Sequence, residues 1–183
     1  MLEYILRIKL SNRFVANKRV AFAAIIIGLC VGLFASCVRR PNIQGKGTVF
    51  MQGVWNEDSV AFSNRLKTFT QNHFKFTCDS FYLDLTTNSK VNFYEDSCFN
   101  KGIWKEYVKG VYAVKNDTLS LGGTFTYADY KQKISGCYRI GRYERNFIIK
   151  KADSNVIILV SPTDQREITL NLKQKITCVQ KSL

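Results

Sequence analysis

The chain has 183 residues, with 27 lysines and arginines against 14 aspartates and glutamates, and a hydrophobic fraction of 46%. This length fits one domain, and the abundance of apolar and aromatic residues excludes a disordered chain, while the scarcity of glycine and proline excludes a collagen-like sequence. The sequence has a single histidine, no Cys-x-x-Cys motif and no glycine-rich phosphate loop. Most common catalytic and metal-binding layouts are therefore excluded.

Residues 1–36 have the pattern of an export leader. Five basic residues precede an uncharged apolar run at 20–36, which would cover roughly 25 Å as a helix. This is shorter than the ~30 Å hydrocarbon core of a bilayer, so the run lies between a signal peptide and a minimal membrane span. We expect an N-terminal hydrophobic signal helix.

The end of this run points to lipidation. It reads Leu33, Phe34, Ala35, Ser36, Cys37, with two small residues directly before the cysteine. This resembles the lipobox of bacterial lipoproteins, except that Phe34 stands where the usual motif has Leu, Val or Ile. The resemblance implies cleavage before Cys37, and acylation of Cys37 by palmitate-like chains that hold the protein on a membrane.

The alternative is an uncleaved helix that the basic flank orients, with Cys37 as an ordinary thiol. Both alternatives place the residues after 37 outside the cytoplasm, and cleavage would remove Cys30 with the leader. Residues 37–47 form a polar tether, followed by a domain at 48–183. Surface-exposed lipoproteins of Bacteroidota resemble one another in carrying acidic residues behind the cysteine, and this tether has none. We therefore expect a cell-envelope protein on the outer membrane, facing the periplasm.

The part of the chain after the leader remains basic. Its charges are scattered, and we expect the densest groups to belong to a solvated face: Lys131 and Lys133, and Arg139, Arg142, Arg145, Lys150 and Lys151. Expected partners are the membrane, a lipid or small apolar ligand, or an envelope protein, and not nucleic acid.

Four cysteines after the tether are candidates for two disulfides: Cys78, Cys98, Cys137 and Cys178. They allow three pairings, and the sequence does not choose among them. The expected strand order favours Cys78 with Cys98 and Cys137 with Cys178. The wide spacing contains no pair of the kind that zinc sites use, so no metal site is expected.

From residue 48 onward, the apolar residues follow a period of two. The predicted strands are 48–55, 73–79, 81–87, 90–95, 107–115, 118–127, 136–143, 147–151, 156–160 and 167–176. Residues 56–71 are expected to form a loop or short helix over the barrel mouth. Polar turn residues join several strands, so the sequence predicts a mostly β domain. We expect an antiparallel up-and-down meander that closes into a small barrel or forms a strongly curled sheet.

Two resemblances add to this prediction. Gly53 and Trp55 at the end of the first predicted strand resemble the Gly-x-Trp opening of lipocalins, which implies a lipocalin-like barrel with the tryptophan plugging its closed end. The chain also resembles a family of small Bacteroidota lipoproteins without an established activity. The quoted segments are QGVW at 52–55, FKFTCDSFYLDLTT at 74–87, KVNFYEDSCFNKGIWKEYVKGVY at 90–112, NDTLSLGGTF at 116–125 and KQKISGCYRIG at 131–141.

Catalysis is not expected from these residues. Similar sequences sometimes carry the name fumarate hydratase, but fumarases need either a long helical subunit with a mobile Gly-Ser-Ser loop or cysteine ligands for an iron–sulfur cluster in a reduced cytosol. The best acid–base pair would join His73 to a carboxylate such as Asp79, Asp84, Asp96 or Glu106, and nothing in the sequence fixes them together. We expect no enzyme and no cofactor.

Two functions of different classes remain. The first is a lipid-anchored binding module for a small apolar ligand or lipid, lined by some of the aromatic residues: Phe50, Trp55, Phe76, Phe81, Phe93, Trp104, Tyr112 and Phe125. The second is a structural lipoprotein with a filled interior that docks onto an envelope complex. An internal cavity would favour the first function.

Overall fold

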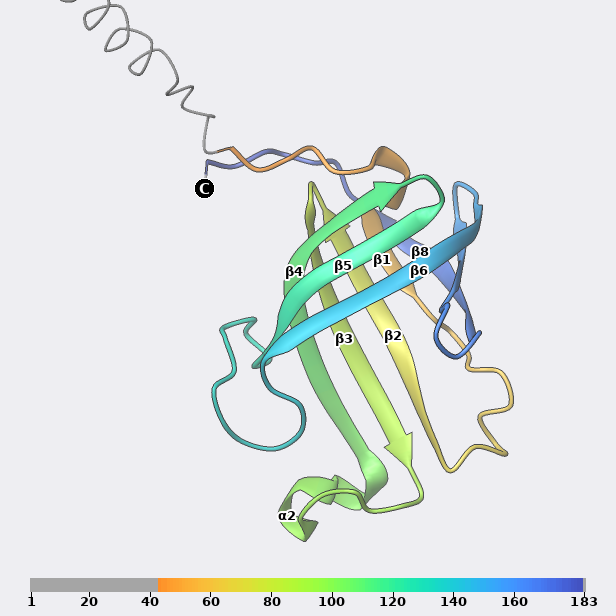
Figure 1. Ribbon diagram of the computed structural model, residues 1–183, viewed down its shortest axis with the longest axis vertical. Coiled ribbons are helices and arrows are strands. Elements are labelled where there is room, and N and C mark those ends of the chain that lie inside the picture. The colour runs from red at the N-terminus through yellow and green to blue at the C-terminus, as the bar shows by residue number, and fades with distance from the viewer. Residues whose placement is uncertain (1–42, 183) are drawn as a thin grey trace, which may run out of the picture. The chain divides into compact units, whose positions relative to one another are not determined.

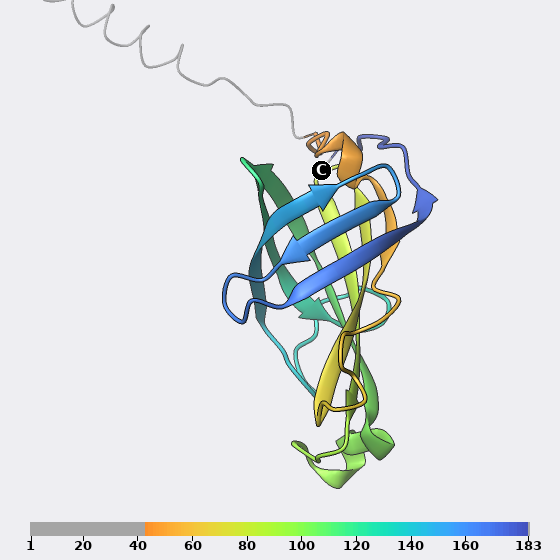
Figure 2. The ribbon, with the colours of Figure 1, turned by 90° about the vertical axis from the view of Figure 1, so that its right-hand side faces the viewer.

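Eight antiparallel strands make up most of residues 43–182, the part of the chain that the computed structural model describes (Figures 1 and 2). Each strand pairs with its neighbour in sequence, and the last strand also pairs with the first, so the sheet closes into a barrel. The strands are β1 (Gly53–Asn56), β2 (Thr68–Thr77), β3 (Ser80–Ser89), β4 (Ile103–Lys115), β5 (Thr118–Thr126), β6 (Arg142–Ala152), β7 (Val156–Val160) and β8 (Glu167–Lys175). The predicted mostly β meander, closed into a barrel, is confirmed.

The helices are short: η1 (Val49–Met51), α2 (Asp96–Phe99) and η2 (Asn100–Gly102). Within residues 43–182, no helix combines the length and the apolar character needed to cross a membrane. The predicted signal helix at 1–36 and the predicted lipidation site Cys37 lie outside the described residues. The compact unit begins at Ile43 and so includes the end of the predicted tether.

The predicted strand at 90–95 is wrong. This segment belongs to the β3–β4 connection, which continues into α2 and η2. The Ser89 hydroxyl accepts from the amide of Val91 at 3.1 Å, and the side-chain Oδ1 of Asn92 accepts from the amide of Tyr94 at 2.9 Å. These local hydrogen bonds give the backbone an alternative to strand pairing.

The strands predicted at 136–143 and 147–151 are a single strand, β6. Gly136 and Gly141 have φ values of 97° and 84°, which a strand does not accommodate, so residues 127–141 form a loop and β6 begins at Arg142. The polar run 144–146 continues the strand instead of forming a turn. In addition, β2 begins at Thr68, inside the segment expected to be a loop or helix.

Side chains from every second position of the strands fill the barrel interior. In β3, Phe81, Leu83 and Leu85 point inward, and in β8, Ile168 and Leu170 do so. Along a strand, successive side chains face opposite sides of the sheet, so one face of each strand supplies the core. Eight strands enclose an interior just wide enough for side chains, which makes the middle of this barrel solid.

The two ends of the barrel differ. We use the name closed end for the end that contains η1, the tight β2–β3 turn and the segments 43–48 and 176–182. We use the name mouth for the opposite end, which consists of the connections 57–67, 90–102, 127–141 and 161–166. At the closed end, the side chain of Gln52 donates to the Cys78 carbonyl at 2.7 Å and to the Tyr112 hydroxyl at 2.8 Å, and accepts from the Cys78 amide at 2.6 Å. Trp55 is fully buried and donates to the Met51 carbonyl at 2.8 Å.

Two disulfides join Cys78 to Cys178 and Cys98 to Cys137, so the favoured pairing was wrong. Cys78 lies at the closed end and Cys98 on the β3–β4 connection at the mouth, with the ten residues of β3 between them. At about 3.3 Å per residue, a strand of this length separates its ends by roughly 33 Å, far beyond the reach of a disulfide. In the chain-entropy model, the loops that the observed bridges close correspond to about 4 to 5 kcal/mol of stabilisation each.

Close contact between β4 and β5 requires glycine. Gly110 faces Gly123 in the register, and a Cβ atom on Gly110 would overlap the carbonyl oxygen of Gly122. A Cβ atom on Gly122 itself would meet nothing within 4 Å. The close packing of the two strands therefore requires glycine at position 110 but not at position 122.

We predict that Gly110→Ala lowers the free energy of unfolding by about 2 kcal/mol or more, because the added methyl group forces the two strands apart. Gly122→Ala is the matched control and should change it by less than about 0.5 kcal/mol. Urea denaturation followed by tryptophan fluorescence measures both values. Equal effects of the two substitutions would contradict the close packing.

Candidate functional site

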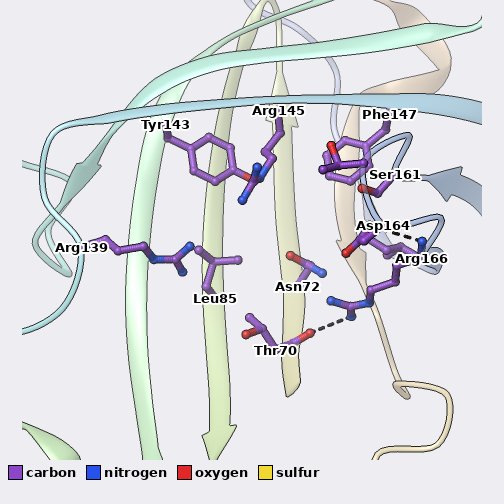
Figure 3. Close-up of a pocket in the computed structure, with 12 residues that line it drawn as sticks. Thr70, Asn72, Leu85, Arg139, Tyr143, Arg145, Phe147, Ser161, Asp164 and Arg166 are labelled. Carbon is purple, nitrogen blue, oxygen red and sulfur yellow. Dashed lines mark hydrogen bonds between the residues drawn. The ribbon is translucent and has the colours of Figure 1, made fainter. Parts of the chain in front are cut away.

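A cavity of about 230 Å³ opens at the mouth of the barrel (Figure 3). Its walls combine apolar and polar side chains from β2, β3, β6, β8 and the connections at this end. The lining residues are Thr70, Asn72, Leu85, Arg139, Tyr143, Arg145, Phe147, Ser161, Thr163, Asp164, Arg166 and Ile168.

The opening arises from unequal strand lengths. Residues 142–148 of β6 pair with β5, but pairing with β7 begins only at Ile148, so most of this half of β6 has no strand on its other side. The β7–β8 connection at 161–166 lies across the gap and supplies polar side chains. The cavity therefore lies where one wall of the barrel is incomplete.

Alternation along β6 places Tyr143, Arg145 and Phe147 on the same face. The two aromatic residues are buried, whereas Arg145 is exposed and extends into the cavity, as Figure 3 shows. Among residues 43–182, no carboxylate forms an ion pair with Arg145. Its guanidinium is available to a ligand.

On one side of the cavity, Glu57 organises a polar cluster. Its side chain is 1% exposed; one carboxylate oxygen accepts from Arg166 at 2.6 Å, and the other accepts from the amide and side chain of Asn72 at 3.0 and 2.6 Å. Arg166 also donates to the carbonyl of Thr70 at 2.7 Å (Figure 3). A buried carboxylate needs such partners, and here they fix Asn72 and Arg166 at the cavity wall.

On the other side, Glu106 holds Arg139. The 3%-exposed carboxylate accepts from the Arg139 amide, Nε and Nη2 at 3.1, 2.9 and 2.8 Å, and from the Trp104 indole at 3.4 Å. The guanidinium lies 4.9 Å from the ring centre of Phe125. These contacts hold the Arg139 side chain in a defined orientation at the cavity.

The charges of these groups follow from their surroundings. Burial raises the pKa of Glu106, but the hydrogen bonds and charge of Arg139 outweigh burial and hold the pKa below its ordinary value. Burial raises the pKa of Tyr143 to about 12, although Arg145 and Arg139 oppose this shift. Tyr143 therefore stays a neutral hydroxyl that can donate a hydrogen bond. Asp164 is kept charged, because a hydrogen bond from the Ser161 hydroxyl lowers its pKa.

The aromatic residues predicted to line a ligand site lie elsewhere. Trp55, Phe76, Phe81 and Tyr112 pack in the core, and none of them lines the mouth cavity. Trp104 and Phe125 lie against Glu106 and Arg139, behind the lining. Phe93 is 64% exposed on the β3–β4 connection, and Phe50 is exposed at the closed end.

Sequence reasoning missed the arginines. Arg139 and Arg145 were interpreted as part of a solvated face, but both line the cavity. The signal was present in Tyr143, Arg145 and Phe147, because a period of two puts an arginine between two aromatic residues on one face. The error was to break β6 into two strands at this point.

Among residues 43–182, no group of three or more His, Cys, Asp or Glu side chains could hold a metal ion. His73 faces Asp84 across the β2–β3 ladder on the outer surface of the barrel. Asp84 instead accepts a hydrogen bond from the hydroxyl of Tyr130 at 2.5 Å.

No family model, curated protein or solved structure matches this chain. The resemblance to Bacteroidota lipoproteins therefore stays a prediction from the sequence segments quoted above.

We predict that Glu106→Gln lowers the free energy of unfolding near pH 7 by about 1 to 3 kcal/mol, because it removes charge-assisted hydrogen bonds from a buried pair. The folded-state pKa of Glu106 lies below its unfolded value, so the pair stabilises the fold above the ordinary carboxyl pKa of about 4.3. This contribution is lost as the pH falls through the lowered pKa. The difference between wild type and variant should thus shrink in acid.

The matched control is Glu144→Gln, which breaks an exposed ion pair with Arg142 on the outer face of β6. Exposed pairs contribute little, so its effect should stay near zero across the same pH range. Chemical denaturation at a series of pH values tests both variants. A loss in Glu106→Gln that does not depend on pH would contradict the assigned ionisation.

Proposed function

We propose that this protein is a lipid-anchored, non-enzymatic binding module of the cell envelope whose barrel mouth takes a small organic anion with an apolar body. The sequence predicted a lipid or apolar ligand among aromatic side chains. Most of those side chains pack in the core or behind the cavity wall, Phe50 and Phe93 are exposed elsewhere, and none of them lines the mouth cavity. The proposal keeps the binding class and assigns the ligand to the mouth cavity.

Arg145 carries the proposal. It lines the cavity between two buried aromatic residues, it is open to solvent, and no carboxylate among residues 43–182 forms an ion pair with it, so its five N–H donors are free to bind an anion. Arg139 and Arg166 flank the same cavity, already oriented by Glu106 and Glu57. Guanidinium groups bind carboxylate and phosphate by paired hydrogen bonds, so this cavity suits an anionic group.

The cavity sets the size and shape of the ligand. Its volume of about 230 Å³ is below the range of roughly 300 to 1,000 Å³ that is typical of sites for drug-sized ligands. Leu85, Phe147 and Ile168 provide an apolar wall, while Asp164 at the opening disfavours a second negative charge there. A short monocarboxylate fits these features better than a whole phospholipid.

The position of the mouth also favours a water-soluble ligand. Ile43, the residue nearest the predicted anchor among those described, pairs with Ser182 at the closed end. The mouth is at the opposite end of the barrel, as Figures 1 and 2 show by the place of α2. A ligand would enter from the aqueous side.

Closure of the sheet disfavours the alternative function. Each of the eight strands pairs with two neighbours, and the unpaired half-edge of β6 at 142–147 is crossed by the 161–166 connection, so residues 43–182 offer a partner strand only short stretches of edge. A structural lipoprotein would have to dock through side chains of the barrel surface.

We predict that the purified protein binds butyrate or hexanoate, and that Arg145→Gln weakens this binding by about 10- to 100-fold, the equivalent of one charge-assisted hydrogen bond. Titration followed by NMR chemical shifts or calorimetry measures the affinities. Arg142→Gln is the matched control, because Arg142 belongs to the same strand but does not line the cavity.

Hexylamine and hexanol should bind more weakly than hexanoate if the arginines select the anion. Equal binding of all three compounds, or an unchanged affinity in Arg145→Gln, would contradict the assigned site. No binding by any of them, together with a co-purifying protein, would favour the structural function.

For the anchor, we predict that the protein incorporates radiolabelled palmitate in its own host and that Cys37→Ser abolishes the label. Cys30→Ser is the control and should remain labelled, since Cys30 is expected to leave with the leader. Mass spectrometry of the mature protein gives the cleavage site. A Cys37→Ser protein that keeps the wild-type mass and label would refute the anchor.

A further inference from the structure

The closed end exposes large apolar side chains. Val49 is 80% exposed and Val179 is 74% exposed, and Ile43 and Phe50 are also exposed at this end. They belong to the segments 43–50 and 176–182, which run beside each other where the chain enters and leaves the barrel (Figure 1). The connections at the mouth also expose apolar side chains, such as Phe62, Phe93 and Ile134, so what distinguishes the closed end is its short distance along the chain from the proposed anchor.

A hollow of about 370 Å³ lies between the same two segments. Val49 and Ile176 line it together with Lys46 and Lys175. No acidic side chain of the described region forms an ion pair with either lysine. The neighbouring carboxylate of Asp79 accepts from the amide of Gly45 at 2.8 Å. The closed end thus combines apolar side chains with unpaired positive charge.

The chain itself brings this surface to a membrane. Cys37, the proposed acylation site, precedes Ile43 by six residues, and a chain of that length spans at most about 20 Å. An anchor at Cys37 therefore keeps the closed end close to the lipid headgroups at a high effective concentration. Arg39 and Arg40 add positive charge to this short connection.

We propose that the closed end docks onto the surface of the anchoring membrane. Val49, Phe50 and Val179 enter the boundary between headgroups and acyl chains, and Lys46 and Lys175 contact anionic phospholipid headgroups. This inference depends on the proposed anchor and not on the ligand of the mouth. Docking in this way directs the mouth away from the bilayer.

The test uses the full chain reconstituted in vesicles of phosphatidylcholine and phosphatidylglycerol with brominated acyl chains. Val49→Trp adds an indole at the closed end, and Ile134→Trp, at a similarly exposed position on the 127–141 loop of the mouth, is the control. We expect a blue shift and bromine quenching for Val49→Trp several-fold stronger than for Ile134→Trp. The native tryptophans, Trp55 and Trp104, are buried. Their signal, measured in the wild-type protein, is subtracted from the signal of each variant.

Replacing Lys46 or Lys175 by Gln in the Val49→Trp background should lower the ratio of docked to undocked protein by about fivefold for each lysine. Equal quenching at both positions, or none at position 49 in protein that floats with the vesicles, overturns the docking and leaves the anchor intact. Protein that does not float with vesicles overturns the anchor and the docking together. A blue shift without bromine quenching also overturns the proposal, because it means that a protein covers this face.

Discussion

Closure of the barrel by the pairing of β1 with β8 is the constraint on which the other features depend. In a closed meander, successive connections alternate between the two ends, so the position of a residue along the strands decides at which end it lies. Cys78 and Cys178 meet at the closed end across a separation of 100 residues, while Cys98 and Cys137 meet at the mouth. The same rule brings the chain entry to one end and the arginines to the other.

Two buried carboxylates give the mouth its character. Glu57 and Glu106 lie on different sides of the cavity, and each is satisfied by an arginine and by further donors. Removing an ionised carboxylate from water is costly, and such a pair contributes little net stability compared with apolar packing. What the pairs do provide is orientation, because Arg139 and Arg166 are held at the cavity wall before any ligand arrives. Arg145 lines the same cavity, and no carboxylate in the described part of the chain forms an ion pair with it.

The two ends of the barrel carry different kinds of side chain. The solid middle, filled by the inward faces of the strands, separates a closed end with exposed apolar and basic side chains from a mouth with oriented arginines. An anchor near Ile43 would hold the first end at a membrane and leave the second end free to solvent. Under the proposed function, the ligand site would thus face away from the bilayer.

The sequence alone determined the mostly β fold class, because period-two apolar residues and polar turns specify antiparallel strands. It left open whether the meander closes into a barrel or forms a curled sheet, and the pairing of β1 with β8 decided for closure. The leader and the acylated cysteine stay predictions from local sequence patterns, because they lie outside the described residues. Only the tertiary structure decided the disulfide pairing and the site. Both depend on strand lengths and register: ten residues of β3 separate Cys78 from Cys98, and a continuous β6 turns Arg145 inward. Glycines at 136 and 141, and local hydrogen bonds at 89–94, set those strand ends, and their effect on pairing appears only when the whole sheet is assembled.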